Sequence, residues 1–166
     1  MIAEAMPENP NDYFYSKKDP VFMETTLQAF RDANLEVNTI DDIVDLGFYL
    51  TIAVKCAKIG YSVPTNAIKN CSFILEKEIN LFLNYKVIML MGDVAIKAMN
   101  YIARRNSGKR AIPSGSTYKI RKDEFYYKNI RLFPSYLITG KNYLIEKSKR
   151  RMIAEDITNA MDYIKK

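Results

Sequence analysis

One apolar run constrains the fold of this chain more than any other feature of its sequence. The run Val87–Met91 contains no polar side chain, and Gly92-Asp93 turns the chain directly after it. Such a run is typical of a strand that is covered on both faces, as in a parallel sheet whose crossovers are helices. The segment 94–105, which follows, has the composition of a helix. The run therefore predicts an α/β fold with helices packed on both sides of the strand.

Other segments continue this alternation of strands and helices. Strands are expected at 2–5, at 48–54, and in a hairpin formed by 117–120 and 125–132, with the sequence Phe133-Pro134-Ser135 breaking the last strand. Helices are expected at 19–34, 41–46, 64–83 and 141–164. Because no repeat or linker interrupts the chain, we expect a single domain over residues 1–166. Its predicted architecture has three layers, α/β/α, around a mostly parallel sheet of four to five strands.

Histidine is absent from the 166 residues, and charge is unevenly distributed along them. The absence excludes a histidine general base, a Ser-His or Cys-His nucleophile pair and a histidine zinc ligand. Residues 1–96 carry 13 acidic and 8 basic side chains, whereas residues 97–166 carry 6 acidic and 17 basic ones. A one-sided basic excess favours a polyanionic partner, with nucleic acid first and an acidic membrane second. The alternative is a solvated surface on which the fold mixes the two halves.

Targeting and compartment signals are sparse. No apolar run reaches the roughly 18 residues of a membrane span, and the first residues lack the regions of a signal peptide. Two cysteines do not make a disulfide framework, so a reducing cytoplasm is the expected location. We expect a monomer without membrane contact.

Five segments, in order along nearly the whole chain, resemble motifs of the uracil-DNA glycosylase superfamily, in particular its iron-sulfur, thermophile-type branches. The similar segments are Ala3-Glu4-Ala5-Met6-Pro7 (the Gly-Glu-Ala-Pro-Gly motif), Leu50 to Cys56 (the Thr-Asn-x-Val-Lys-Cys motif), Cys71, Val87 to Ala95 (the Leu-Gly-x-x-Ala element) and Phe133-Pro134-Ser135 (the His-Pro-Ser motif). Two departures affect chemistry. Phe133 replaces the histidine that stabilises the departing base in the family, and Ile52 replaces the asparagine that reads uracil.

The resemblance implies a base pocket at the carboxyl ends of the strands. Glu4 would orient the attacking water, although a carboxylate that only caps nearby backbone is an equal alternative. The remaining pocket positions are Ala5, Met6, Pro7, Phe14, Tyr15, Ile52 and Phe133, where one ring of the aromatic loop would stack on a flipped base. Packing of those rings onto the core is the alternative.

Basic and loop residues complete the predicted interface with DNA. The candidates are Lys55, Arg131, Ser135, Tyr136, Leu137 and Lys141, with Lys55 or Arg131 taking over part of the anion stabilisation. Further basic residues surround the loop 106–115 and mark the hairpin and the last helix. Each cluster taken alone is equally consistent with a solvated surface.

Cys56 and Cys71 match two of the four cluster cysteines of the iron-sulfur branches. A cubane cluster normally has four thiolate ligands, so we predict no cofactor unless an upstream segment supplies two more cysteines. The predicted function is binding of DNA, with hydrolysis of the N-glycosidic bond of a damaged or deaminated base. The alternatives are a catalytically inactive DNA- or nucleobase-binding module of the same fold, and a pocket for a nucleotide or small metabolite.

Overall fold

A computed structural model describes residues 1–16, 20–57, 60, 62–138, 140 and 142–165 of the chain. Among these residues one five-stranded sheet has the strand order β2-β1-β3-β5-β4. The strands are β1 (Ile2–Met6), β2 (Thr51–Ala57), β3 (Val87–Met91), β4 (Phe125–Tyr127) and β5 (Ile130–Ser135). Neighbouring strands pair in parallel, except that β4 runs antiparallel to β5. The expected mostly parallel sheet is thus confirmed.

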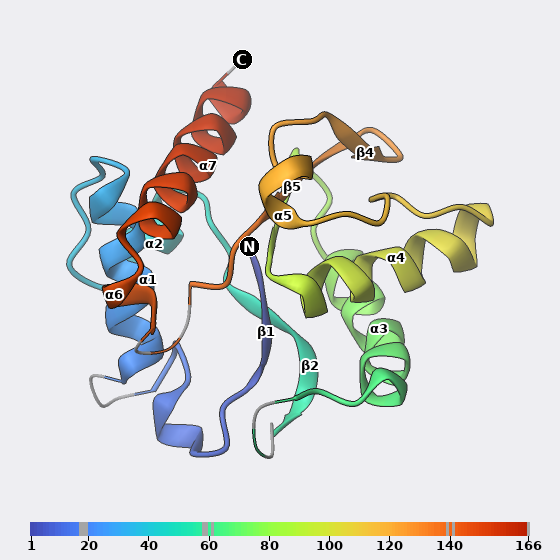
Figure 1. Cartoon of the computed structure of the whole chain (residues 1–166), viewed down its shortest axis with the longest axis horizontal. Coiled ribbons are helices and arrows are strands. Elements are labelled where there is room, and N and C mark those ends of the chain that lie inside the picture. Colours follow the sequence, from blue (N-terminus) through green and yellow to red (C-terminus); the bar gives the residue numbers. More distant parts are fainter. Residues whose placement is uncertain (17–19, 58–59, 61, 139, 141, 166) are drawn as a thin grey trace.

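Helices cover both faces of this sheet, as Figure 1 shows. One layer contains α1 (Val21–Asp32), α2 (Ile40–Asp45), α6 (Asn142–Ile145) and α7 (Lys147–Lys165), and the other contains α3 (Thr65–Ile79), α4 (Asp93–Ser107) and the single turn α5 (Thr117–Ile120). A short 3-10 turn, η1 (Pro10–Asp12), lies between β1 and α1. Each layer buries its own apolar cluster against the sheet. The three-layer α/β/α architecture follows from these two cores.

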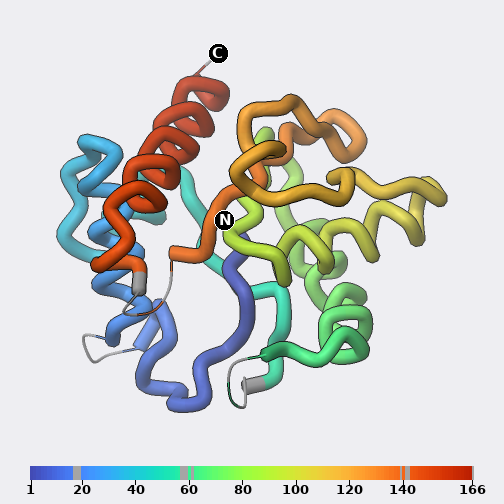
Figure 2. The backbone as a smooth tube through the Cα atoms, in the orientation of Figure 1, coloured from blue at the N-terminus to red at the C-terminus, as the bar shows by residue number. Residues whose placement is uncertain are grey.

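The strand order creates a switch point between β1 and β3. From β1 the chain crosses to β2 on the α1 side, then passes back over β1 on the α3 side to reach β3. Figure 2 traces this path from the blue N-terminal segment to the green β3 region. In open α/β sheets, ligands bind outside the carboxyl ends of the strands at such a reversal. A fold of this kind therefore predicts a ligand site at the carboxyl ends of β1 and β3.

Strand register aligns one row of residues across the sheet near that edge. Ala3 pairs with Ile52, Ile2 pairs with Leu90, and Met91 pairs with Ser135. Ala3 is therefore level with Met91, and β1 and β2 extend beyond the ends of β3 and β5. Because residues of one row in parallel strands point to the same face, this row faces the α1 and α7 layer.

The expected hairpin is wrong in its first arm. Thr117–Ile120 forms the helical turn α5, and the hairpin lies wholly within 125–135, where β4 pairs with the start of β5. Four residues are too few to show a strand or helix period, so composition alone misled the prediction. Gly115 permits this turn, since a Cβ atom there would lie 2.8 Å from the Ile120 side chain.

The expected strand break at Phe133-Pro134-Ser135 is also wrong, because β5 continues to Ser135. The backbone amide of Arg131 donates to the Lys86 carbonyl, on the β3 side. Because successive residues of a strand direct their backbone groups to opposite sides, those of position 134 face away from β3. On that outer side β4 pairs only as far as Leu132. The missing N–H of Pro134 therefore costs no ladder hydrogen bond.

Several expected boundaries shift in the structure. The strand expected at 48–54 is Thr51–Ala57, and the helix expected at 64–83 ends at Ile79. The last expected helix is divided into α6 and α7. Asp19 and Lys141, which were expected to begin helices, lie outside the described residues. Within the described part of the chain, no helix combines the length and apolar character that a membrane crossing needs.

Candidate functional site

The loops after β1, β3 and β5 meet at the carboxyl edge of the sheet. Gly92 ends β3 with a φ of 95°, and its amide donates to the Ser135 carbonyl at 2.9 Å. That φ is one that L side chains rarely adopt, so glycine suits the turn between β3 and α4. Leu137, one of the predicted DNA-contacting residues, lies beside Gly92, because a Cβ atom built there would be in ordinary contact with its side chain at 3.4 Å.

Three of the predicted base-pocket residues belong to the large apolar core on the α1 and α7 side. Phe14, Ile52 and Phe133 belong to the same buried cluster on the α1 and α7 side, with exposures of 1%, 1% and 7%. Met6 and Tyr136 pack against this cluster as half-buried side chains. Ile52 lies on β2 and Phe133 on β5, three strands apart in the sheet order, so this large core does not bring the two side chains into one pocket. Phe133 also lines a hollow of about 770 Å³, together with Arg121, Arg131 and Asp156.

The other predicted pocket residues lie around that core. Pro7 is buried at the end of β1, whereas Ala5 packs in the opposite core, on the α3 and α4 side. Tyr15 is 45% exposed, and its hydroxyl both donates to the Leu50 carbonyl (3.0 Å) and accepts from the Leu50 amide (3.3 Å). Tyr15 thereby covers the polar backbone groups beside the start of edge strand β2.

Glu4 is half-buried in β1, two residues before the strand ends. Its neighbours in the strand pack in different cores, Ala3 on the α1 and α7 side and Ala5 on the α3 and α4 side. Glu4 thus lies in the strand that borders the switch point.

Ser135 is held by a carboxylate that the sequence analysis did not single out. Its hydroxyl donates to Asp156 on α7 at 2.5 Å, and Arg121 donates to the same carboxylate at 2.7 and 3.2 Å. All three residues are buried. Burial raises the pKa of the Asp156 carboxyl, against the opposing effect of Arg121 and Ser135. A charged residue on the apolar stripe of Ile153 and Ile157 was the signal that could have identified this network.

The two predicted anion-stabilising cations are engaged elsewhere. Arg131 lies at the amino end of β5, where its guanidinium donates to the carbonyls of Phe125 (3.2 Å) and Leu132 (2.8 Å) and lies 4.5 Å from the Phe133 ring centre. Lys55 forms an ion pair with Glu78 on α3. Nearer the carboxyl edge, the Lys149 ammonium lies 5.8 Å from the ring centre of Tyr136.

A basic cleft of about 400 Å³ lies between α4 and the loop 110–115. Lys97, Arg104 and Arg110 line it, with Asp93, which pairs with Lys97 at 3.0 Å, and the polar side chains of Thr65, Asn100, Tyr101 and Ser114. Asn100 fixes the loop, because it accepts from the amides of Ala111 and Ile112 at 3.0 and 2.9 Å and donates to the Ile112 carbonyl at 2.9 Å. The cleft is therefore a preformed basic surface on the α4 side of the switch point.

Adjacent arginines on α4 have different roles. Arg105 turns toward α3, where it pairs with Glu76 (2.5 Å), donates to Ser72 and lies 3.9 Å from the ring centre of Phe73. Arg104 instead lines the basic cleft and makes no ion pair with a described residue. Only part of the basic C-terminal half is thus available to a partner.

The cysteines do not provide the ligand set of an iron-sulfur cluster. Cys56 is exposed on β2, and Cys71 is buried in the apolar stripe of α3. Over residues 1–16, 20–57, 60, 62–138, 140 and 142–165, no three Cys, Asp or Glu side chains are grouped to bind a metal ion. Two thiols alone do not fit a cubane, which uses four thiolates.

These features define a doubly wound α/β protein with a switch point between β1 and β3, the place where ligands bind in folds of this kind. The model of the uracil DNA glycosylase superfamily matches residues 6–157. The chain belongs to this superfamily. Glu4 and Ala5 precede the matched range. A search of the curated proteins found no match.

Proposed function

We propose that this chain binds DNA at the carboxyl edge of its sheet and hydrolyses the N-glycosidic bond of a damaged or deaminated base. The observation that carries the proposal is membership of the superfamily over residues 6–157, in a fold whose switch point lies beside a preformed basic cleft. Phosphates would contact Arg104 and Arg110, which fix the duplex without reading its sequence. The segment after β5, which includes Tyr136 and Leu137, would enter the base stack.

In the proposed reaction, Glu4 orients a water molecule toward the sugar carbon C1′. The new C–O bond forms as the C1′–N bond breaks, and the base leaves with the bonding electron pair and then takes up a proton. Without the family's histidine at position 133, backbone N–H groups would have to stabilise the departing base. A base that enters from the carboxyl edge must also displace buried apolar side chains such as Phe14 and Ile52, in addition to the cost of unstacking it from the duplex.

A base-release assay tests the catalytic part. Duplexes containing uracil, hypoxanthine, xanthine or an alkylated base are incubated with the native protein, with Glu4→Ala and with the control Glu8→Ala. Glu8 is exposed just beyond the strand, so its loss should leave release unchanged. We expect Glu4→Ala to slow release by about 10²- to 10⁴-fold, the usual contribution of a positioned acid or base. Base release that is no faster with the native protein than with Glu4→Ala would refute the catalytic part of the proposal.

Fluorescence anisotropy over a range of salt concentrations tests the DNA-binding part. Replacing Arg104 and Arg110 by alanine should weaken binding and reduce the slope of log K against log salt by about 1.8, or about 0.9 per lost phosphate contact. The control, Lys86→Ala with Lys165→Ala, removes the same charge away from the cleft. An equal loss in both double variants would show that only net charge matters.

The second candidate function is a DNA-binding module without the chemistry. The burial of Phe14, Ile52 and Phe133 favours it, because Ile52 and Phe133 offer no hydrogen bond to a base. This candidate predicts salt-dependent DNA binding with little dependence on the base present, and no base release from any duplex.

A further inference from the structure

A hollow of about 330 Å³ lies at the amino ends of β1 and β3, away from the carboxyl edge that the proposed function uses. Its deepest side chains are nearly inaccessible: Ile2 is 3% exposed and Met89 is 1% exposed. At its rim, Val44, Tyr49 and Phe82 are 40 to 44% exposed. The hollow is thus open to solvent at one end and apolar at its base, and its volume is within the range of small-molecule sites.

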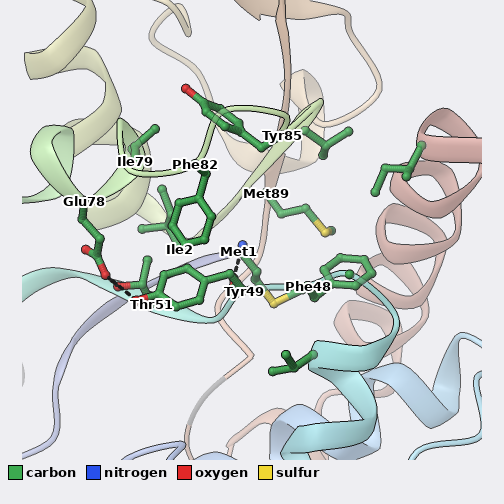
Figure 3. A pocket seen from close by; sticks show the side chains of 14 residues that line it. Met1, Ile2, Phe48, Tyr49, Thr51, Glu78, Ile79, Phe82, Tyr85 and Met89 are labelled. Carbon is green, nitrogen blue, oxygen red and sulfur yellow. Dashed lines mark hydrogen bonds between the residues drawn. The ribbon is translucent and has the colours of Figure 1, made fainter.

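Aromatic rings and a single carboxylate line this hollow, as Figure 3 shows. The rings belong to Phe48, Tyr49, Phe82 and Tyr85, and those of Tyr49 and Phe82 are 4.7 Å apart between centres. Glu78 is the one side chain with a formal charge among the fourteen lining residues. Ring faces attract an organic cation, and a carboxylate beside them strengthens that attraction.

Glu78 is held ionised and oriented by its neighbours. Its Oε1 atom accepts from the Tyr49 hydroxyl at 2.9 Å and from the Thr51 hydroxyl at 2.8 Å, and its Oε2 atom accepts from Lys55. Burial alone would raise the pKa of Glu78, but these hydrogen bonds hold it below its ordinary value. Because a carboxylate has about four acceptor positions, one remains for a donor in the hollow.

The lining side chains carry no positive charge. Lys55, which pairs with Glu78, and Lys86, which donates to the Ile164 carbonyl at 3.2 Å, both lie outside the lining. A cationic ligand therefore meets no positively charged side chain in the lining itself.

We propose that this hollow is a binding site for an organic ammonium ion with apolar substituents. The apolar part lies over Met89 and between the rings of Phe48 and Phe82, and the ammonium group donates toward Glu78. This site is separate from the carboxyl edge, so its occupancy does not depend on whether the protein binds or repairs DNA.

The test uses 2-phenylethylamine and phenylacetate, which share a ring but carry opposite charges. Protein labelled with ¹³C at its eight methionine methyl groups reports the binding position. We expect the amine to shift the Met89 resonance with a Kd on the order of 1 mM, as suits so small a ligand. The Met99 methyl, buried in the opposite core, should not shift. Phenylacetate should bind at least about tenfold more weakly.

Two variants locate the site. Val44→Trp places a large ring at the exposed rim and should abolish the Met89 shift, whereas the control Leu83→Trp lies outside the hollow at 90% exposure and should leave it intact. Glu78→Gln should reduce amine binding to the level of phenylacetate. The proposal is overturned if the amine gives no Met89 shift at a concentration about ten times the expected Kd. It is also overturned if the two probes bind equally, or if Val44→Trp binds the amine as the native protein does.

Discussion

Replacing Ser135 by alanine distinguishes a structural from a DNA-contacting role for this residue. Its side chain is fully buried, and its hydroxyl is 2.5 Å from the carboxylate of Asp156, which is itself 2% exposed. The variant loses a hydrogen bond to a charged group, which typically contributes about 1.5–3 kcal/mol. Arg121 still pairs with Asp156, so no buried charge is left without a partner. For a chain of this size the loss corresponds to a decrease in Tm of roughly 3–12 °C.

Two further variants calibrate that magnitude. Asp156→Ala removes the main partner of buried Arg121 and should cost about 3–5 kcal/mol. Ser107→Ala removes a hydroxyl that bonds only the Ala103 carbonyl at an exposed helix end, and should change stability by less than about 0.5 kcal/mol. Urea unfolding at pH 7, followed by circular dichroism, measures all three free energies.

DNA affinity provides the opposing measurement. Because the Ser135 hydroxyl points to Asp156, its removal should leave the Kd for DNA within about twofold of the native value. A twofold change corresponds to only about 0.4 kcal/mol, less than one weak contact contributes. The reasoning fails if Ser135→Ala is as stable as Ser107→Ala, or if it weakens DNA binding about tenfold while the free energy of unfolding is unchanged.

Three other predictions follow from single sites. Burial alone would raise the pKa of Asp32, but hydrogen bonds from Arg150 and two other donors hold it below the ordinary value. The ionised carboxylate therefore stabilises the fold fully above about pH 4, and this stabilisation is lost as pH falls through the folded-state pKa. Asp32→Asn should therefore flatten the acid limb of a stability profile, and an unchanged limb would contradict the pairing. Gly92→Ala should lower the free energy of unfolding by about 1–3 kcal/mol, measured in urea, because of its positive φ; no loss would argue against the turn. Iodoacetamide should label exposed Cys56 in the native protein and buried Cys71 only after unfolding, as mass spectrometry would show; equal rates would contradict the burial.

Local pattern was sufficient for the longer elements. The apolar run Val87–Met91 and the spacing along α3 and α4 each contain enough residues to show a period or a fully buried strand, so the parallel sheet and its covering helices were predictable. The segment Thr117–Ile120 was not, because four residues fit either a strand or a helical turn and are too few to show a period. The same limit applied at Pro134, whose tolerance depends on where the neighbouring strand ends.

The sequence by itself determined which residue types are available and in which order they occur. These are a glycosylase-like series of motifs at strand ends, a basic C-terminal half and no histidine. Only the tertiary structure decided which of these residues are free to act. Arg104 and Arg105 are neighbours in sequence, yet one lines a cleft and the other pairs with Glu76. Ser135 is paired with a carboxylate 21 residues away. Periodicity is a property of neighbouring residues, whereas burial and pairing depend on which distant elements share a core, and that is settled only when the sheet and both helix layers assemble.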